Sequence, residues 1–126
     1  MAGFVTNIEA DTRQNDNFRK VIFTAPHSQL VLMTLQPGEE IGREVHPNVD
    51  QFFRIETGEG KVVIAGQETA IRDGSAIVVP AGNEHNVINT GRAPLRLYTI
   101  YSPPNHPAGT IHRTKKEAEA YEASRH

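Results

Sequence analysis

Seven short apolar segments, separated by turn residues, occupy the chain between residues 21 and 101 and constrain its fold more than any other feature. They are rich in Val, Ile, Phe, Tyr and Thr, whose side chains suit a pleated, half-buried surface. Gly, Pro, Asn and Asp stand between them, and these residues favour turns. The predicted strands are Val21–Phe23, Leu30–Leu35, Phe52–Ile55, Lys61–Ile64, Ala76–Val79, Asn86–Ile88 and Leu95–Tyr101. Short strands at a spacing of about ten residues predict an all-β sandwich or barrel.

One helix is expected near the C-terminus, at about residues 114–124. Thr114 and Glu117 have the spacing of a capping box, and the residues that follow are strong helix formers without Gly or Pro. Its apolar side is thin, which predicts a solvated helix lying on the barrel or a frayed end. At the other end of the chain, the polar residues Glu9–Asn17 are expected to form a loop or a mobile arm.

Composition excludes several kinds of site. The chain contains no Cys, so it has no disulfide, zinc finger, iron–sulfur ligand set or thiol nucleophile. Any metal must therefore be held by imidazole, carboxylate, amide or water. The formal net charge of −2 gives no electrostatic reason to expect nucleic acid or an anionic membrane as a partner.

Length and segment composition indicate a single domain that spans residues 1–126. The first thirteen residues lack a basic stretch followed by an apolar one, so we expect no secretory signal. No apolar run approaches the ~20 residues that cross a bilayer. Neither a phosphate-binding Gly-rich loop nor a Gly-x-Ser-x-Gly elbow is present. The expected location is the cytoplasm.

Two groups of Gly, Pro and polar residues have a regular spacing. The first group consists of Gly38, Glu44, His46, Gln51 and Gly58, and the second of Gly74, Pro80, Gly82, His85 and Asn89. Glu44 and His46 are two residues apart, so in a strand they would share one face. Gln51 can return to that face if residues 47–50 form a turn, and His85 would arrive from a distant strand. Four side chains from separate strands can converge inside a barrel.

These two segments resemble the sequence motifs of the cupin family. The first cupin motif reads Gly, five residues, His-x-His, three or four residues, Glu, six residues and Gly. The second reads Gly, five residues, Pro-x-Gly-x-x-His and an Asn three residues later. The resemblance covers residues 38–89 and, with the flanking strands, extends to about residue 104. It implies an antiparallel jelly-roll β-barrel and a homodimer, often formed by exchange of N-terminal strands.

The same resemblance implies one divalent transition metal ion bound by Glu44, His46, Gln51 and His85. Glu44 stands where the motif has its first His, and Gln51 where it has Glu. By ligand type, the set suits Fe, Mn, Ni or Zn with water in the open positions. Gln51 would be either a weak fourth ligand or a group that orients a bound water. The competing interpretation makes Glu44 a solvent-facing charge beside Arg43.

Four further histidines are expected to have surface or loop roles: His27, His106, His112 and His126. Those at positions 106 and 112 reach a pocket mouth if the C-terminal segment folds over the barrel. If Gln51 faces inward, alternation places Phe53 and Ile55 on the same inner face, as core residues. Alternation does not decide whether Tyr98 or Tyr101 faces the metal.

We expect a metal-dependent enzyme that acts on a small polar metabolite, with dioxygenase, isomerase and lyase chemistry all open. Some cupins are labelled mannose-6-phosphate isomerase-like, but a shared fold does not carry a shared reaction. One alternative is a non-catalytic module or sensor for a metal or a metabolite, favoured by the lack of an obvious general base beyond the ligands. Another is a degenerate cupin with an empty pocket, favoured by the two ligand changes.

Overall fold

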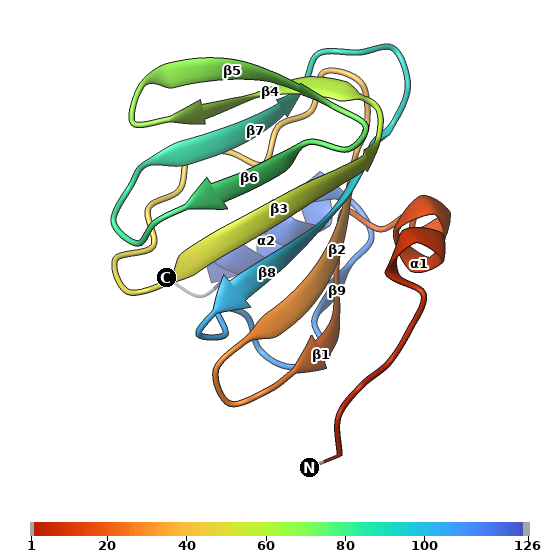
Figure 1. Cartoon of the computed structure of the whole chain (residues 1–126), viewed down its shortest axis with the longest axis vertical. Helices are drawn as coiled ribbons and strands as arrows, with labels where there is room; N and C mark the ends of the chain where they lie inside the picture. Colours follow the sequence, from red (N-terminus) through yellow and green to blue (C-terminus); the bar gives the residue numbers. More distant parts are fainter. Residues whose placement is uncertain (1, 125–126) are drawn as a thin grey trace.

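Two antiparallel sheets face each other across an apolar core in the computed structural model, which describes residues 2–124 (Figure 1). The larger sheet has the order β6 (Ala76–Val79), β3 (Asp50–Thr57), β8 (Leu95–Ser102), β2 (Gln29–Leu35), β1 (Arg19–Thr24) and β9 (Ile111–His112). The smaller sheet has the order β5 (Gln67–Arg72), β4 (Glu59–Ile64) and β7 (His85–Asn89). This arrangement confirms the predicted antiparallel, all-β jelly-roll barrel.

All seven predicted strands are present, most of them longer by one to several residues, and the structure adds β5 and β9. β5 escapes prediction because its sequence, Gln-Glu-Thr-Ala-Ile-Arg, has a single buried side chain, that of Ile71. Its strand character comes from main-chain pairing with β4 along its whole length. β9 is too short to produce a periodic signal, and its pairing with β1 places His112 opposite Arg19.

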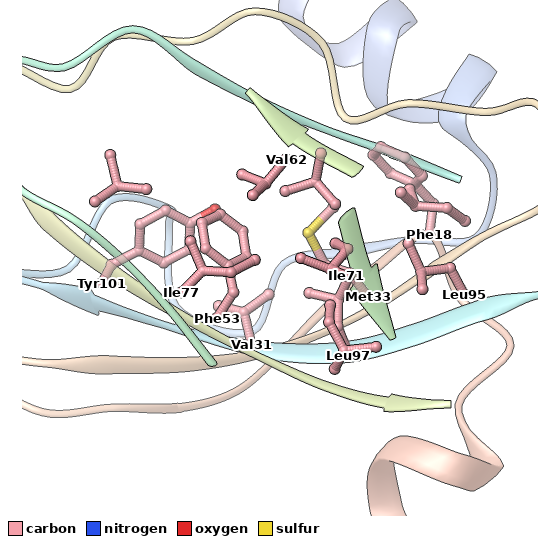
Figure 2. Packing of buried hydrophobic residues seen from close by; sticks show 14 of the residues in the cluster. Phe18, Val31, Met33, Phe53, Val62, Ile71, Ile77, Leu95, Leu97 and Tyr101 are labelled. Carbon is pink, nitrogen blue, oxygen red and sulfur yellow. The ribbon is translucent and has the colours of Figure 1, made fainter. Parts of the chain in front are cut away.

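The core lies between the two sheets and is built by strand alternation. On β3, Phe53 and Ile55 are buried and belong to the apolar cluster, as predicted, and Gln51 points to the same side. Figure 2 shows Phe53 beside Tyr101 at one end of the cluster and Phe18 near Leu95 at the other. The polar Gln51 therefore continues a row of core residues toward one end of the barrel.

Two glycines allow close approaches between segments of the barrel. Gly58 has φ +110°, and a Cβ at this position would meet the main chain of Pro94 and Leu95 at 2.9 Å. A Cβ on Gly60 would lie 2.4 Å from the main-chain oxygen of Ile88 on the neighbouring strand. Gly60 thus permits the close pairing of β4 with β7, and β7 begins with the candidate ligand His85.

The prediction of a loop or mobile arm at residues 9–17 is wrong, because α1 (Ile8–Gln14) occupies most of this segment. The Asn7 side chain caps the helix by accepting from the main-chain N–H of Ala10 at 2.9 Å. α1 packs on the outside of the larger sheet, beside β8 (Figure 1). Arg96 of β8 anchors the residues that follow, through a 2.9 Å ion pair with Asp16. The sequence shows no apolar periodicity for this helix because Thr12 is its one buried residue.

The predicted C-terminal helix is present as α2 (Lys115–Ser124). Thr114 caps it, accepting at Oγ1 from the N–H of Glu117 at 3.0 Å. Ala118 is buried in the core cluster, and the Tyr121 ring packs on His112 with centroids 5.0 Å apart. Neither helix within residues 2–124 is long and apolar enough to cross a membrane.

Candidate metal centre

Glu44 and His46 lie in irregular chain between β2 and β3, not in the strand that their spacing predicts. Gly42, with φ +110°, and Pro47, which has no N–H to donate, prevent a continuous ladder here. A single antiparallel bridge remains: the Glu44 N–H donates to the His85 carbonyl at 2.9 Å, and the His85 N–H donates to the Glu44 carbonyl at 3.0 Å. This bridge joins the first motif directly to the second.

The structure brings three of the four predicted ligand residues into one cluster. One ligand atom from each of Glu44, His46 and His85 lies within 4.8 Å of the others. Glu44 Oε2 is 3.7 Å from His46 Nε2, and the two imidazole centroids are 5.3 Å apart. Ligand atoms bonded to one ion at about 2.0–2.2 Å lie roughly 3–4 Å from each other. The cluster therefore needs only small side-chain rotations to enclose one ion.

His85 and Gln51 are in direct contact. His85 Nδ1–H donates to the Asn83 carbonyl at 3.0 Å, which fixes the orientation of the ring. His85 Nε2 is 3.1 Å from Gln51 Oε1, while Gln51 Nε2 donates to Thr99 Oγ1 at 2.9 Å. An imidazole nitrogen and an amide oxygen are both atoms that can bind a metal ion. The buried Gln51 thus joins the site through His85.

His46 carries an unsatisfied buried nitrogen. Its Nε2 atom is inaccessible to solvent and has no hydrogen-bond partner among the residues that the structure describes. Leaving such a group unpaired costs about 1–3 kcal/mol. A metal ion would satisfy it, and the donor set of two imidazoles and one carboxylate is of the type that divalent transition metals prefer. The residues present therefore fit the metal that the sequence predicts.

Burial sets the ionisation of the cluster. It raises the pKa of Glu44 above its ordinary value, against the lowering effects of Arg19 and His85. Burial also lowers the pKa of His46, and the charges of His85 and Arg19 lower it further. A lowered pKa keeps His46 neutral, the form in which imidazole binds a metal.

A cavity of about 620 Å³ opens beside Glu44 and His46, with Ala118 and Glu122 of α2 in its wall. The sequence left two places open for His106, the protein surface or a pocket mouth. His106 lines this cavity, which agrees with the second. His112 is buried instead of exposed. His27 is exposed, as predicted. His126 lies outside the described residues.

Tyr101, not Tyr98, faces the cluster of Glu44, His46 and His85. Its ring packs edge-on against His46 with centroids 5.9 Å apart, whereas Tyr98 packs on Phe52 at the opposite face of the sheet. The Tyr101 hydroxyl is 3.2 Å from His106 Nε2. Burial, and then the charge of Glu44, raise the pKa of Tyr101 well above its ordinary value, so its hydroxyl stays protonated.

Gln29 holds the loop that carries His106. Its Oε1 accepts from the main-chain N–H groups of Asn105 and His106 at 3.1 and 3.0 Å. Its Nε2 donates to the His106 carbonyl at 2.7 Å. Gln29 is only 1% exposed. A buried side chain on β2 thus fixes a loop far along the sequence at the cavity.

Arg19 is a cavity residue that the motifs do not indicate. It is buried on β1, where it alternates with the core residue Val21. That alternation is the signal that could have found it, because an inward-facing charged residue in a strand needs a polar partner.

Comparison with known proteins agrees with the fold and the motifs. The model of the cupin domain matches residues 31–101. The chain is 54% identical over 125 residues to the uncharacterized protein YrkC of Bacillus subtilis, which covers 94% of this chain and 67% of that protein. The crystal structure of BH2720 from Bacillus halodurans has a TM-score of 0.93 and 47% identity, covering 94% of this chain and 95% of that one.

The chain is also similar, more distantly, to part of an enzyme. The mannose-1-phosphate guanylyltransferase of Klebsiella pneumoniae is 27% identical over 82 residues, which cover 65% of this chain and 17% of that protein. The shared region is thus a small part of a much larger protein. The domain match, the fold and the two motifs together place this chain in the cupin family.

Proposed function

We propose that this cupin binds one divalent transition metal ion through Glu44, His46 and His85, with Gln51 as the fourth group, and that it is a metal-dependent enzyme acting on a small polar metabolite. The convergence of three ligand-type side chains within 4.8 Å carries the proposal. The unsatisfied His46 Nε2 and the contact between His85 Nε2 and Gln51 Oε1 support it independently.

The cavity beside the cluster supports catalysis. When bound, a divalent ion with open positions supplies Lewis-acid chemistry, polarising a substrate oxygen or lowering the pKa of bound water. His106 lines the same cavity, and its Nε2 is 3.2 Å from the buried Tyr101 hydroxyl. His106 is therefore a candidate proton-transfer group beyond the ligands, the kind of group whose apparent lack favoured a non-catalytic module. The distant similarity to a mannose-1-phosphate guanylyltransferase supports small-molecule chemistry without identifying the substrate.

Metal analysis of protein purified without an affinity tag tests the metal. We expect about one equivalent of Fe, Mn, Ni or Zn in the wild-type protein and less than about 0.1 equivalent in His85→Ala. His27→Ala, which changes an exposed histidine, is the matched control and should retain the metal. Less than about 0.1 equivalent in the wild type, with no gain on adding these four metals, would contradict the proposal. Bound metal without turnover in a broad substrate screen would favour a sensor instead.

Gln51 gives a second prediction. Gln51→Ala should lower metal affinity by about tenfold or less, because an amide oxygen is a weak ligand. Gln51→Glu should raise the affinity, since it adds a carboxylate 3.1 Å from His85 Nε2, but should destabilise the metal-free protein by burying that charge near Glu44. Thermal unfolding with and without metal measures both effects. If Gln51→Ala costs as much affinity as Glu44→Gln, the ranking of these two ligands is wrong.

The homodimer, the cytoplasmic location, the absence of nucleic-acid partners and the single domain at 1–126 stay predictions. The edge strand β6 exposes Val78, at 65% of its surface, and such an edge is a physical reason for pairing.

A further inference from the structure

Helix α2 forms part of the wall of the cavity beside Glu44 and His46. Four of its ten residues line this cavity: Lys115, Ala118, Glu119 and Glu122. His46 lines it too, and its Nε2, a proposed ligand atom, is inaccessible to solvent in this arrangement. Movement of α2 away from the barrel would therefore open the cavity beside the proposed ligands.

Little apolar surface holds α2 against the barrel. Ala118 is the one buried residue of the helix, and the half-buried Tyr121 packs its ring on His112. Elements that bury few apolar side chains open locally at a lower free energy than the whole domain unfolds. α2 is thus a part of the cavity wall that can move while the two sheets stay folded.

The hydrogen bonds of Glu117 and Ser124 stay within the C-terminal segment. Glu117 Oε1 accepts from the main-chain N–H of Arg113 at 3.3 Å, and Ser124 Oγ donates to the Tyr121 carbonyl at 2.7 Å. Neither bond ties α2 to the sheets. The chain is anchored up to Arg113, whose carbonyl accepts from the main-chain N–H of Phe18 at 3.1 Å. The exposed residue 114 between this anchor and α2 is therefore the place for a hinge.

Glu122 brings a negative charge to the cavity on the face of α2 that carries Ala118. The two residues are four positions apart, so they lie one above the other on the helix. After burial, the charge of Glu122 is a further cause that raises the pKa of Glu44. The two carboxylates are thus within electrostatic reach of each other when α2 is closed.

A divalent ion would change how the cluster of Glu44, His46 and His85 acts on the closed helix. Without an ion, an ionised Glu44 repels Glu122. With one, two positive charges exceed the single negative charge of Glu44, so the cluster attracts Glu122. Lys115 and Glu119, the other charged α2 residues of the cavity, have opposite signs, and their responses to the ion offset each other. The charged cavity residues outside α2 and the cluster keep their charges when an ion binds: Arg19, Glu40 and Arg43.

We propose that α2 is a lid on this cavity, which opens about Thr114 while the barrel stays folded and which a bound divalent ion holds closed through Glu122. The coupling to the ion rests on the metal-binding function proposed above, whereas the opening itself does not. A ligand that binds the closed form better shifts the lid toward closure. Metal loading therefore slows the exchange of small molecules between the cavity and solvent.

Thiol labelling tests the opening without metal. The chain has no Cys, so Ala118→Cys introduces a single thiol at the buried contact of α2. Val31→Cys, at a fully buried position of β2, and Ala120→Cys, exposed on α2, are the two matched controls. We expect an aromatic disulfide reagent to label Ala118→Cys about tenfold or more faster than Val31→Cys and about tenfold or more slower than Ala120→Cys. Low urea should accelerate the labelling of Val31→Cys more steeply, because opening of α2 exposes less surface than global unfolding.

Both limits of this comparison are decisive. Urea unfolding curves give the global stability of each variant, and from it the labelling rate that global unfolding alone allows. Labelling of Ala118→Cys at that rate would show that α2 opens only with the whole domain. Labelling as fast as that of Ala120→Cys would show that α2 does not cover the cavity. Either result would overturn the lid.

Labelling with and without metal tests the coupling. Fe²⁺, Mn²⁺, Ni²⁺ and Zn²⁺ are added in turn to the Ala118→Cys protein, and competition with a chelator measures which of them binds. A bound ion should slow labelling by about tenfold or more. Glu122→Gln in the same background should reduce this slowing to less than about threefold. Glu119→Gln removes a carboxylate from the same helix and cavity and should retain the slowing.

The two carboxylate variants also separate the possible failures. Equal slowing in Glu122→Gln and Glu119→Gln would overturn the role of Glu122, and it is the result expected if the introduced thiol itself bound the ion. A bound ion that leaves the labelling rate unchanged would overturn the coupling. A chain that binds none of the four ions refutes the proposed function and the coupling with it, and the metal-free comparison still decides whether α2 is a lid.

Discussion

Glu44→Gln is expected to lower the affinity for a divalent ion by about 100-fold or more, because it removes the carboxylate from the Glu44–His46–His85 cluster. The substitution keeps the shape of the side chain and leaves the main-chain bridge between Glu44 and His85 unchanged. The loss of affinity would therefore report on the ligand itself and not on a distorted site.

Glu44→Gln should not lower the stability of the metal-free protein, although it lowers the metal affinity. Burial raises the pKa of Glu44 in the folded protein above its ordinary value. A carboxyl group with a raised folded-state pKa costs stability at pH values above that pKa, and the cost disappears as the pH falls below its ordinary value. Glu44→Gln removes this cost, so the metal-free variant should unfold at pH 7 at the same temperature as the metal-free wild type or higher.

Competition with a chromophoric chelator measures the affinity, and thermal unfolding in the presence of excess chelator measures the stability. Glu40→Gln changes another acidic residue of the same cavity and should alter neither quantity appreciably. Metal content that stays at the wild-type value in Glu44→Gln would show that the assignment of ligands is wrong.

Gly60→Ala is expected to destabilise the fold by about 3 kcal/mol or more. The new Cβ would lie 2.4 Å from the main-chain oxygen of Ile88 and 3.2 Å from the side chain of Leu95. Neither the ladder oxygen nor the buried leucine can move freely, so β7 must shift away from β4. Metal affinity should fall as well, because His85 is the first residue of β7.

Gly66→Ala is the matched control for this substitution. Gly66 has φ +82°, but a Cβ there meets nothing within 4 Å. Gly66→Ala should lower the free energy of unfolding only by the backbone cost of a positive φ, about 1 kcal/mol. Urea unfolding curves of both variants measure the difference. Equal losses for Gly60→Ala and Gly66→Ala would contradict the close approach between β4 and β7.

The sequence predicts the strands whose side chains alternate with burial and misses elements defined by main-chain bonds. β3 is predictable because Phe53 and Ile55 alternate with more exposed residues. β5 is not, since hydrogen bonds to β4 define it while all its side chains except that of Ile71 are exposed. α1 is missed for a related reason: its cap at Asn7 and its anchoring through Arg96 give little apolar periodicity.

The candidate site also contains residues that the sequence predicts and one that it does not. Motif spacing predicts that Glu44, His46 and His85 converge, and they do so although the strand expected at Glu44 and His46 is reduced to one bridge. Arg19 could not be placed by spacing. Its partner His112 is 93 residues away, and only the pairing of β1 with β9 brings the two together. Contacts of this kind depend on topology, which no local pattern encodes.

The main-chain bridge between Glu44 and His85 also has a consequence for the entropy of metal binding. Two proposed ligands that are distant in sequence are held together by a pair of hydrogen bonds, so the conformational entropy of assembling them is lost during folding. An ion would therefore meet a preassembled site, unlike a zinc finger, which folds only around its metal. Removal of the metal should leave a folded, cooperative apoprotein that can accept a new ion without refolding.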